Sequence, residues 1–489
     1  MAPCAKLRDF RSLPEKQIGD KSEAFEMLLF IILFLAIVPP ISYSLLALLN
    51  KLLVHPTTFP KCFPVVGPRK QILSVVRASL RQITRGIQTL LDGYSKHGQR
   101  GKPFVVYDPS GQQELLVPAE YVKWLCSQLD SNLSDHGVLQ ERHAAKYLDK
   151  DVELSTSRQF LERLIGDRLN RHLDKLQPLL HEEFQKHIDE VYGKDEEEWK
   201  ELNVYRGFED IVIPTVSRVL LGLQLSRDPQ VFIPFRRYSL LLGLLFVGEV
   251  PHVLKQQQLA LGTDNRSDAG EASFIWHAAK HSEKSIVSGV GTASKPEVIA
   301  EWVMLLGMAG THTTIFQGAN LLLNIANCAK EWRVVERLRE EAQETLTGDA
   351  DWADASGFKR QVLANSVIRE TLRLNPVTIK GLTKEVMPSS GFQLPDGTSM
   401  PKGGWAISHG HDPDAAKPST TYLTFGYGRS SCPGRRFAVL MLKKMMAYII
   451  LNYDIESTGP IPPTRAIGDA ALPPRSSTIR IRRRKQARE

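Results

Sequence analysis

The chain has 489 residues, of which 24% are charged and 42% hydrophobic, as is ordinary for a globular protein with a large core. Its five cysteines show no pairing or CxxC spacing, which excludes a disulfide framework and a zinc site and suits a reducing compartment. The net charge of +8 is concentrated at the end, because the stretch from Arg475 onward holds seven Lys or Arg and one Glu. The remainder is close to neutral, so no nucleic-acid partner is predicted.

The first 70 residues divide into three segments. Residues 1–26 have mixed charge and no helical period, and a disordered leader is predicted. Residues 27–49 carry no charge and are long enough to cross a bilayer as a helix, so they predict an uncleaved transmembrane anchor. A cleaved signal peptide and a buried core helix are the alternatives. Residues 50–70 form a proline-rich hinge, and a single folded body is expected over residues 71–489.

The early part of this body is predicted to be mostly helical, with small sheets. Residues 73–93 have helical spacing, and residues 104–117 are typical of a β-hairpin around a Pro-Ser-Gly turn. Further helices are expected near 155–192 and 205–225. The basic C-terminal stretch predicts a short strand over residues 478–482, followed by a solvated basic terminus.

A long helix is predicted over residues 294–327, starting from a capping box at Ser294. Its middle, residues 307–314, contains glycines and consecutive threonines, which weaken helix propensity. A threonine hydroxyl there can bond back to a carbonyl one turn earlier. Two interpretations stay open: a local break that forms a groove beside a ligand, and a small-residue patch where another helix packs closely.

Two amphipathic helices are predicted over residues 331–346, with Trp332 on the apolar stripe, and 362–374. The second contains Glu370 and Arg373, which at i, i+3 can pair on one face. Most pairs of this kind are exposed and contribute roughly a few tenths of a kcal/mol.

The stretch around Cys432 carries the strongest chemical signal. Gly426 and Gly428 predict a tight loop, and the apolar run from Arg435 predicts a helix. Cys432 therefore lies at a helix N-terminus, among Arg429, Arg435 and Arg436, and both the dipole and the cations favour thiolate over thiol. Such a thiolate can be a nucleophile, a metal ligand or a haem ligand, and the plain alternative is a buried thiol.

Phe425, Gly428, Cys432 and Gly434 stand at the spacing of the haem-ligand signature of cytochrome P450 monooxygenases, which this stretch resembles in its fungal variant. The resemblance implies that Cys432 is the axial ligand of the iron of haem b (iron protoporphyrin IX). It also implies that Phe425, Gly428, Arg429 and Gly434 contact the cofactor.

Ser430 departs from the signature, because the family places a basic residue there to hold a haem propionate. Arg429 is expected to serve instead. The family also supplies a basic contact from an early helix, for which Arg142 is the candidate, with His143 and Lys146 as alternatives.

Ala309, Gly310, Thr313 and Thr314 resemble the oxygen-binding signature of the same family. The resemblance implies that Thr313 steadies iron-bound dioxygen and passes protons to it. His312 stands where the family usually has an acid, and it is expected either to relay protons or to be a satisfied histidine facing away from the pocket.

Glu370 and Arg373 resemble the family's Glu-x-x-Arg element, a buried pair that braces the cysteine loop. The interval between Pro413 and Phe425 is shorter than the family's meander region, and no arginine occurs from residue 374 to 428. A buried pair without its third member could cost several kcal/mol. Two interpretations stay open. In the first, Lys417 or local repacking compensates for the missing arginine; in the second, the chain is a shortened, inactive form.

The resemblance implies an α+β cytochrome P450 fold, with a catalytic domain over residues 71–489. The implied activity is oxidoreductase: insertion of one oxygen atom from O2 into an apolar small molecule. The fungal variant suggests secondary-metabolite biosynthesis, with a terpenoid, alkaloid, peptide-derived or polyketide substrate.

The implied partners are NADPH-cytochrome P450 reductase and membrane lipid, at the endoplasmic reticulum membrane with the catalytic domain cytosolic. A basic patch of Arg435, Arg436, Lys443 and Lys444 is expected to dock the reductase or to be a solvated face. The rivals are a degenerate, inactive homologue and a non-enzymatic, membrane-anchored helical binding protein.

Overall fold

The computed structural model describes residues 74–109, 111–135, 170–245, 296–353, 355–408 and 422–485, with short pieces between 45 and 67 and between 138 and 166. The predicted leader, the predicted anchor apart from Leu45, and most of the hinge lie outside this part of the chain. Among the described residues, no helix combines the length and the apolar character that a membrane span requires.

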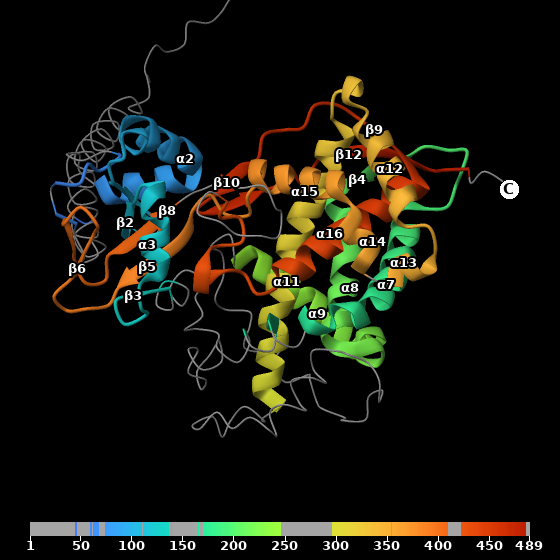
Figure 1. The fold of residues 1–489 in the computed structure, drawn as a ribbon, viewed down its shortest axis with the longest axis horizontal. Coiled ribbons are helices and arrows are strands. Elements are labelled where there is room, and N and C mark those ends of the chain that lie inside the picture. Colours follow the sequence, from blue (N-terminus) through green and yellow to red (C-terminus); the bar gives the residue numbers. More distant parts are fainter. Residues whose placement is uncertain are drawn as a thin grey trace, which may run out of the picture.

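Helices form most of the described body, as predicted. Figure 1 shows α7 to α9 and α11 to α16 grouped on one side, and α2 and α3 with the largest sheet on the other. The helices are α2 (Ser74–Lys96), α3 (Val122–Ser127), α7 (Leu173–Tyr192), α8 (Val204–Arg227), α9 (Pro229–Leu245), α11 (Pro296–Ala326), α12 (Val334–Thr345), α13 (Asp349–Ala353), α14 (Ala355–Arg360), α15 (Val362–Leu374) and α16 (Arg435–Asn452). Short 3-10 turns are η1 (Gly98–Arg100), η2 (Ala119–Tyr121), η4 (Asn170–His172), η7 (Lys330–Trp332) and η8 (Gly428–Ser430).

The strands form small sheets. The largest has the order β1-β2-β8-β5-β3, β12 lies between β4 and β9, and two further pairs are β6-β7 and β10-β11. The predicted hairpin is β1 paired antiparallel with β2, and Gly111, with φ of 90°, allows its turn. The strands are β1 (Phe104–Tyr107), β2 (Gln113–Leu116), β3 (Leu133–Ser134), β4 (Lys200–Asn203), β5 (Gly381–Val386), β6 (Phe392–Gln393), β7 (Ser399–Met400), β8 (Trp405–Ser408), β9 (Tyr453–Ser457), β10 (Arg465–Ile467), β11 (Ala470–Leu472) and β12 (Thr478–Arg483).

Helix α11 runs through the middle of the helical side and packs against α8, α9, α15 and α16 (Figure 1). It is continuous across residues 307–314, so the local break considered from the sequence is not present. The small-residue interpretation holds instead. A Cβ at Gly307 would lie 2.7 Å from the Phe235 ring of α9, and one at Gly318 would lie 2.5 Å from the Phe208 ring of α8. These glycines let α8 and α9 approach α11 closely.

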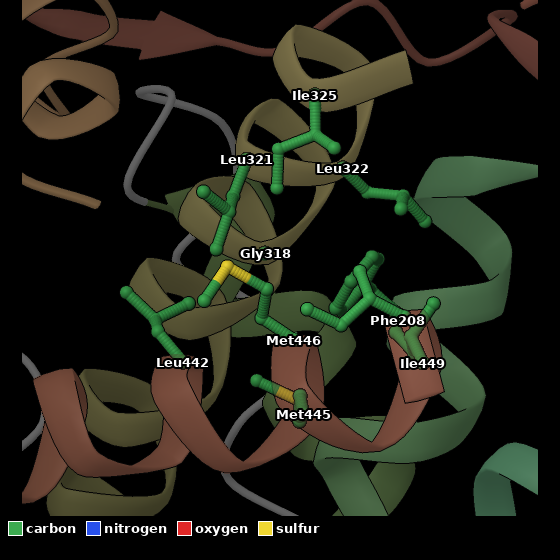
Figure 2. Close-up of a pocket in the computed structure, with 10 residues that line it drawn as sticks. Phe208, Gly318, Leu321, Leu322, Ile325, Leu442, Met445, Met446 and Ile449 are labelled. Atoms are coloured by element: carbon green, nitrogen blue, oxygen red, sulfur yellow. The ribbon is translucent and has the colours of Figure 1, made fainter. Parts of the chain in front are cut away.

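An apolar void of about 10 Å³ lies between α8, α11 and α16, next to Gly318 (Figure 2). Phe208, Leu322 and Met446 are among the residues that line it. The void has room for about one water molecule, but its apolar lining offers no hydrogen-bond partners, so we regard it as a dry packing defect. It borders the C-terminal half of α16, whereas Cys432 precedes the first turn of that helix.

The basic C-terminal stretch forms the predicted strand as β12, but the expectation of a solvated basic terminus is wrong for Arg483 and Arg484. Residues 486–489 lie outside the described part of the chain. Arg483 donates to the buried carboxylate of Asp189 at 2.7 Å, and Tyr448 and Tyr453 donate to the same oxygen. Arg482 and Arg484 both pair with the carboxylate of Asp454. The charges of these three arginines therefore hold β12 and residue 484 against α7 and β9.

The helix expected from residue 331 begins later, at Val334. Arg333 has a left-handed φ of 47° and separates η7 from α12, because a non-glycine residue in that conformation cannot continue a right-handed helix. Trp332 is consequently 67% exposed and does not contribute to the apolar stripe, which was predicted to include it.

Candidate active site

The loop before Cys432 has the tight geometry that its glycines predict. Gly426 and Gly428 have φ of 72° and 59°, and a Cβ at Gly426 would lie 2.4 Å from the Ser430 carbonyl oxygen. The Cys432 amide donates to the Phe425 carbonyl at 2.7 Å, which closes the loop. Only a glycine fits the first of these positions, so the loop fixes the place of the cysteine.

Cys432 lies just before α16, which begins at Arg435. It is an exposed residue, although the surrounding chain is close enough to desolvate its thiol. Burial of the surrounding loop raises the pKa of the Cys432 thiol, and the amides of Gly434 and Arg435 and the charge of Arg435 lower it by less. The net pKa is raised, which opposes the expected preference for thiolate as long as no cation is bound. The Arg435 guanidinium donates to the Cys432 carbonyl, and that of Arg429 donates to the Gln128 carbonyl. A bound metal cation would deprotonate the thiol.

The basic side chain that Ser430 lacks comes from strand β5. Lys384 donates to the Ser430 hydroxyl at 2.8 Å and pairs with the Asp135 carboxylate at 3.3 Å. The lysine side chain is only 5% exposed, so the loop holds a buried cation beside the cysteine. Sequence reasoning missed Lys384, because it precedes Ser430 by 46 positions and only the packing of β5 against the loop brings them together.

Arg429 was expected to replace the basic residue missing at position 430. Its guanidinium is instead bonded to the Gln128 carbonyl at 2.6 Å, at the end of α3. Lys384, the basic side chain that contacts Ser430, is therefore our candidate to hold a haem carboxylate, in exchange for its pairing with Asp135. Arg142, with its alternatives His143 and Lys146, lies outside the described residues.

We expect Lys384→Gln to weaken haem retention by about tenfold, because a charge-assisted hydrogen bond to a carboxylate contributes about 1.5–3 kcal/mol. The measurement is the rate at which the purified holoprotein loses haem to an excess of an acceptor protein. Arg429→Gln is the matched control and should change that rate by less than about twofold, since exposed pairs contribute little. Equal effects of the two substitutions would contradict the assignment.

Thr313 and His312 point to different surroundings on α11. The Thr313 side chain is partly exposed, and its hydroxyl donates to the Ala309 carbonyl at 2.7 Å, as predicted for a mid-helix threonine. His312 is buried, and its Nε2 bonds to the Ser239 carbonyl of α9. This contact favours the interpretation of a histidine that faces a neighbouring helix.

Burial lowers the pKa of His312, the Ser239 carbonyl opposes this shift, and the charge of Arg475 adds to it. The imidazole is therefore neutral near pH 7, with its proton on Nε2 for the Ser239 carbonyl. Nδ1 has no hydrogen-bond partner among the described residues and is the only ring nitrogen open to a proton relay.

Glu370 and Arg373 form the predicted pair, with Arg373 Nε donating to Glu370 Oε2 at 2.7 Å. The pair is not buried, however: the two side chains are 55% and 36% exposed. The buried environment implied by resemblance is therefore wrong. Both residues lie on the outer face of α15, and Lys417, the suggested compensating residue, lies outside the described part of the chain. Because the pair is exposed, its contribution to stability is smaller than that of a buried pair.

The proposed basic docking patch loses two of its members. Lys443 donates to the carbonyls of Phe358 and Gln361, and Lys444 to that of Gln177, and both lysines are buried. Burial lowers the pKa of Lys444 to about 7. Only Arg435 and Arg436 remain accessible on this stretch, because the lysines lie on the face of α16 that packs against α7 and α14.

The helices that carry the three motifs share one core. Gln317, one turn after Thr313 on α11, donates to the Asn375 carbonyl at the end of α15 at 2.7 Å. Arg369 on α15 lies over the ring of Tyr422, 4.6 Å from its centre, in the segment that leads to the cysteine loop. Phe425 and Phe437 pack against the same buried cluster as α11 and α15. The fold thus gathers Thr313, the Glu370–Arg373 pair and Cys432 around a single core.

A helical protein with small sheets and an exposed cysteine on a glycine loop, with two further motifs on α11 and α15, fits the class of haem-thiolate proteins. Residues 278–479 match the sequence model of the family described as Cytochrome P450. The chain is 45% identical to the cytochrome P450 monooxygenase efuH of Hormonema carpetanum, with 87% of each chain covered. It is 43% identical to the cytochrome P450 monooxygenase fsoD of Humicola fuscoatra, over 91% of this chain and 96% of that one.

The fold is also that of a solved structure, the retinoic acid bound cyanobacterial CYP120A1, with a TM-score of 0.62 at 16% identity over 88% of this chain and 99% of that one. The chain belongs to the cytochrome P450 family. It is a cytochrome P450 monooxygenase, and its cofactor is haem, iron protoporphyrin IX, as predicted.

The residues present fit that cofactor. The exposed Cys432 thiol is available as the axial ligand. Lys384, which pairs with Asp135, is the basic side chain that contacts the loop at Ser430. Thr313 is partly exposed on α11, whereas Thr311 and Thr314 on the same helix are buried.

Proposed function

We propose that the protein inserts one oxygen atom from O2 into an apolar small molecule in fungal secondary-metabolite biosynthesis. Electrons would come from NADPH-cytochrome P450 reductase, and residues 27–49 would anchor the chain in the endoplasmic reticulum membrane with the catalytic domain cytosolic. The relatives compared above are fungal monooxygenases, which supports the biosynthetic setting. The substrate class stays open among terpenoids, alkaloids, peptide-derived compounds and polyketides.

The observation that carries this proposal is the presentation of Cys432. The glycine loop leaves its sulfur exposed, and the amides of Gly434 and Arg435 donate to that sulfur from the start of α16. When a metal cation is bound to the sulfur, these two N–H donors stabilise the thiolate form of Cys432. They also limit how much negative charge the sulfur donates to the metal. When bound, thiolate-ligated haem supplies the activation of dioxygen.

Thr313 is suited to handle a proton. Its own hydroxyl proton is directed to the Ala309 carbonyl, so the oxygen lone pairs remain able to accept a hydrogen bond from a water or a bound ligand. The threonine would hold that proton donor in place. His312 could assist only through Nδ1, because Nε2 is occupied by α9.

The absorption spectrum of the reduced, carbon-monoxide-bound protein tests the proposal. A thiolate-type Soret band is expected. Haem with a displaced band would support the degenerate homologue instead, and a protein that purifies without haem, even when haemin is supplied, would contradict both.

Thr313→Ala is expected to uncouple the reaction, so that product per consumed NADPH falls by about tenfold or more. The reason is that the hydroxyl which positions the proton donor is lost while the haem site is untouched. The measurement compares NADPH consumption with product formed. Thr311→Ala on the same helix is the control, because Thr311 is fully buried, and it should keep the wild-type coupling. Full coupling in the Thr313 variant would remove the proposed role.

A further inference from the structure

Residues 376–383, which we call the connecting segment, follow α15 and include the beginning of β5. One end of the segment is fixed to the helix that carries Thr313, because Gln317 on α11 donates to the Asn375 carbonyl at 2.7 Å. The other end is fixed to the cysteine loop, because Lys384 donates to a hydroxyl of that loop at 2.8 Å. The connecting segment therefore links the two halves of the active site.

The connecting segment holds a leucine in an unfavourable backbone conformation. Leu382 has a φ of 55°, and Arg333 is the only other non-glycine residue with a positive φ in the part of the chain that the structure describes. The pairing of β5 with β8 is irregular at the same place, with a shift of register between Gly381 and Lys384. A side chain in the left-handed region crowds its own backbone, so this conformation persists only where contacts on either side fix it.

A buried ion-pair cluster lies directly before this leucine. The Lys380 ammonium binds the Glu114 carboxylate of β2, and it lies 2.6 Å from the Asp469 carboxylate in the turn between β10 and β11. The side chains of Lys380 and Glu114 are fully buried, and that of Asp469 is 18% exposed. A buried ammonium is costly unless it stays paired, so these contacts cannot be exchanged for water. Lys380 thereby ties the connecting segment to two distant parts of the fold.

The backbone of the connecting segment follows the same attachment. The Ile379 amide donates to the Asp469 carbonyl at 2.9 Å, beside the ion pair of Lys380. Ile379 and Lys380 are both buried, whereas Thr378 is exposed and Leu382 is half-buried. The segment thus turns two side chains into the surrounding fold and leaves the neighbouring ones accessible.

We propose that Lys380 is a positioning residue of the monooxygenase. Through its two carboxylate partners it holds the connecting segment as one wall of the site between Thr313 and Cys432, and so it sets how well a molecule larger than dioxygen fits there. Lys380 acts through this wall and does not touch the bound molecule, because its side chain is fully buried among its partners. The inference rests on the haem site and is independent of which substrate the protein takes.

The experiment compares two probes that ligate haem iron, imidazole and 4-phenylimidazole, by the difference spectra of the holoprotein. Imidazole is too small to reach a wall, so the ratio of the two Kd values reports the wall and cancels any change at the iron. The double variant Lys380→Met with Glu114→Gln removes the buried pair without leaving either charge unpaired. It is expected to lower the preference for 4-phenylimidazole by at least about fivefold, because the phenyl group loses its apolar contacts.

Asp469→Asn is the milder variant, since it keeps the pair of Lys380 with Glu114 and weakens only the tie to the turn between β10 and β11. It should lower the same preference by about twofold. A wild-type ratio in this variant would overturn the inference, and so would a wild-type ratio in the double variant. If the double variant does not retain haem, Asp469→Asn alone decides.

Lys443→Met is the matched control. Lys443 is also a buried lysine, but it donates to carbonyls on and beside α14. Its replacement should lower the Tm and keep the wild-type ratio of the two Kd values. An equal fall of the ratio in Lys443→Met would overturn the inference, because any loss of stability would then have the same effect. Wild-type protein that binds neither probe would instead contradict the haem site itself.

Discussion

Cys432→Ala is expected to abolish the thiolate-type Soret band of the reduced, carbon-monoxide-bound protein and to reduce monooxygenase activity below detection. The physical reason is that the glycine loop presents one sulfur, and an alanine offers no ligand in its place. The loop itself should survive, because its closing hydrogen bond comes from the Cys432 amide to the Phe425 carbonyl and not from the side chain. Absorption spectra of the variant, purified with added haemin, provide the measurement.

Cys126 provides a matched control within the same site. It is buried next to the loop, where a Cβ at Gly428 would lie 3.4 Å from its own Cβ. Burial raises the pKa of Cys126 to about 11, with a lowering contribution from Lys384 and a raising one from Asp135. A thiol of this kind stays protonated and is not presented to a ligand. Cys126→Ala should therefore keep the band, and a band that survives in Cys432→Ala but disappears in Cys126→Ala would show that the ligand was assigned to the wrong cysteine.

The local features of the site could be predicted from the sequence because they depend on neighbouring residues. Gly426 and Gly428 specify the loop, the run from Arg435 specifies α16, and the i, i+3 spacing of Glu370 and Arg373 specifies their pair. The hydroxyl bond of Thr313 to the carbonyl one turn earlier is of the same kind. Each needs only the backbone geometry of one loop or one helix.

The predictions that failed concern residues whose surroundings are set by segments far away in the sequence. Lys443 and Lys444 are adjacent basic residues in an otherwise apolar run, and only the contacts of α7 and α14 show that both are buried. Lys384 brings a basic group to Ser430, where the family has a basic residue. Only the packing of strand β5 against the cysteine loop brings the two side chains together. The raised pKa of Cys432 depends on burial by the folded loop, which outweighs the helix N-terminus that the sequence does reveal.

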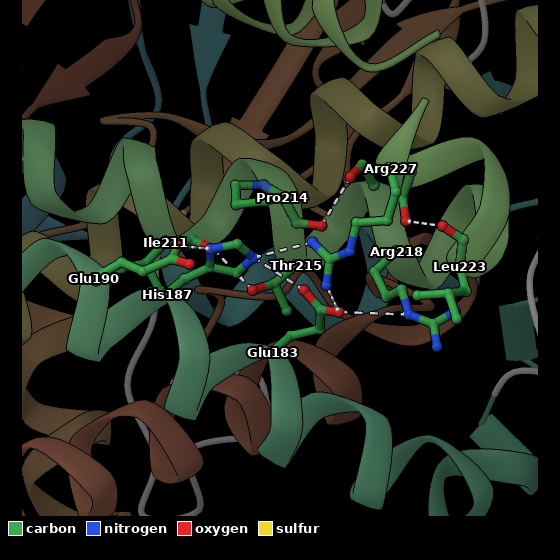
Figure 3. A network of polar contacts seen from close by, with 11 residues as sticks. Glu183, His187, Glu190, Ile211, Pro214, Thr215, Arg218, Leu223 and Arg227 are labelled. Carbon is green, nitrogen blue, oxygen red and sulfur yellow. Dashed lines mark hydrogen bonds and ion pairs between the residues drawn. The ribbon is translucent and has the colours of Figure 1, made fainter. Parts of the chain in front are cut away.

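The second large effect is expected at a buried carboxylate between α7 and α8. Glu183 is fully buried, and Figure 3 shows its side chain surrounded by His187, Arg218 and Arg227. His187 bonds to Glu183 at 3.0 Å, and Arg218 lies 3.4 Å from its other oxygen, which Arg227 also binds. Burial alone would raise the pKa of Glu183, but the hydrogen bonds and charges of His187 and Arg227 outweigh it, so the pKa is lowered.

Glu183→Ala is expected to lower the free energy of unfolding by about 3–5 kcal/mol, because it leaves buried cationic side chains without their carboxylate. Glu190→Gln is the matched control. Glu190 bonds to the same histidine at 3.0 Å, but its side chain is 56% exposed, so its loss should cost less than about 1 kcal/mol. Urea denaturation of both variants measures the difference, and equal losses would mean that burial of the network does not govern its stability.

The pH dependence gives this prediction a second test. A carboxylate with a lowered pKa stabilises the fold above its unfolded pKa, and that stabilisation is lost as the pH falls through the folded value. The difference between wild type and Glu183→Ala should therefore be full at neutral pH and shrink on acidification below the ordinary range of a glutamate. A difference that is constant with pH would indicate a lost packing contact instead of a lost charge.

The consequence extends toward the active site, because Arg227 is the last residue of α8 and α9 begins two residues later, at Pro229. The bond of Arg227 to Glu183 fixes this turn on α7, and α9 in turn gives the Ser239 carbonyl to His312 beside Thr313. Glu183→Ala should thus loosen α9 over α11 and lower coupling as well as stability. The milder Glu183→Gln keeps a hydrogen-bond acceptor but not the charge, so it should fall between wild type and alanine in both measurements. A variant that loses stability but keeps full coupling would show that α9 is positioned independently of this network.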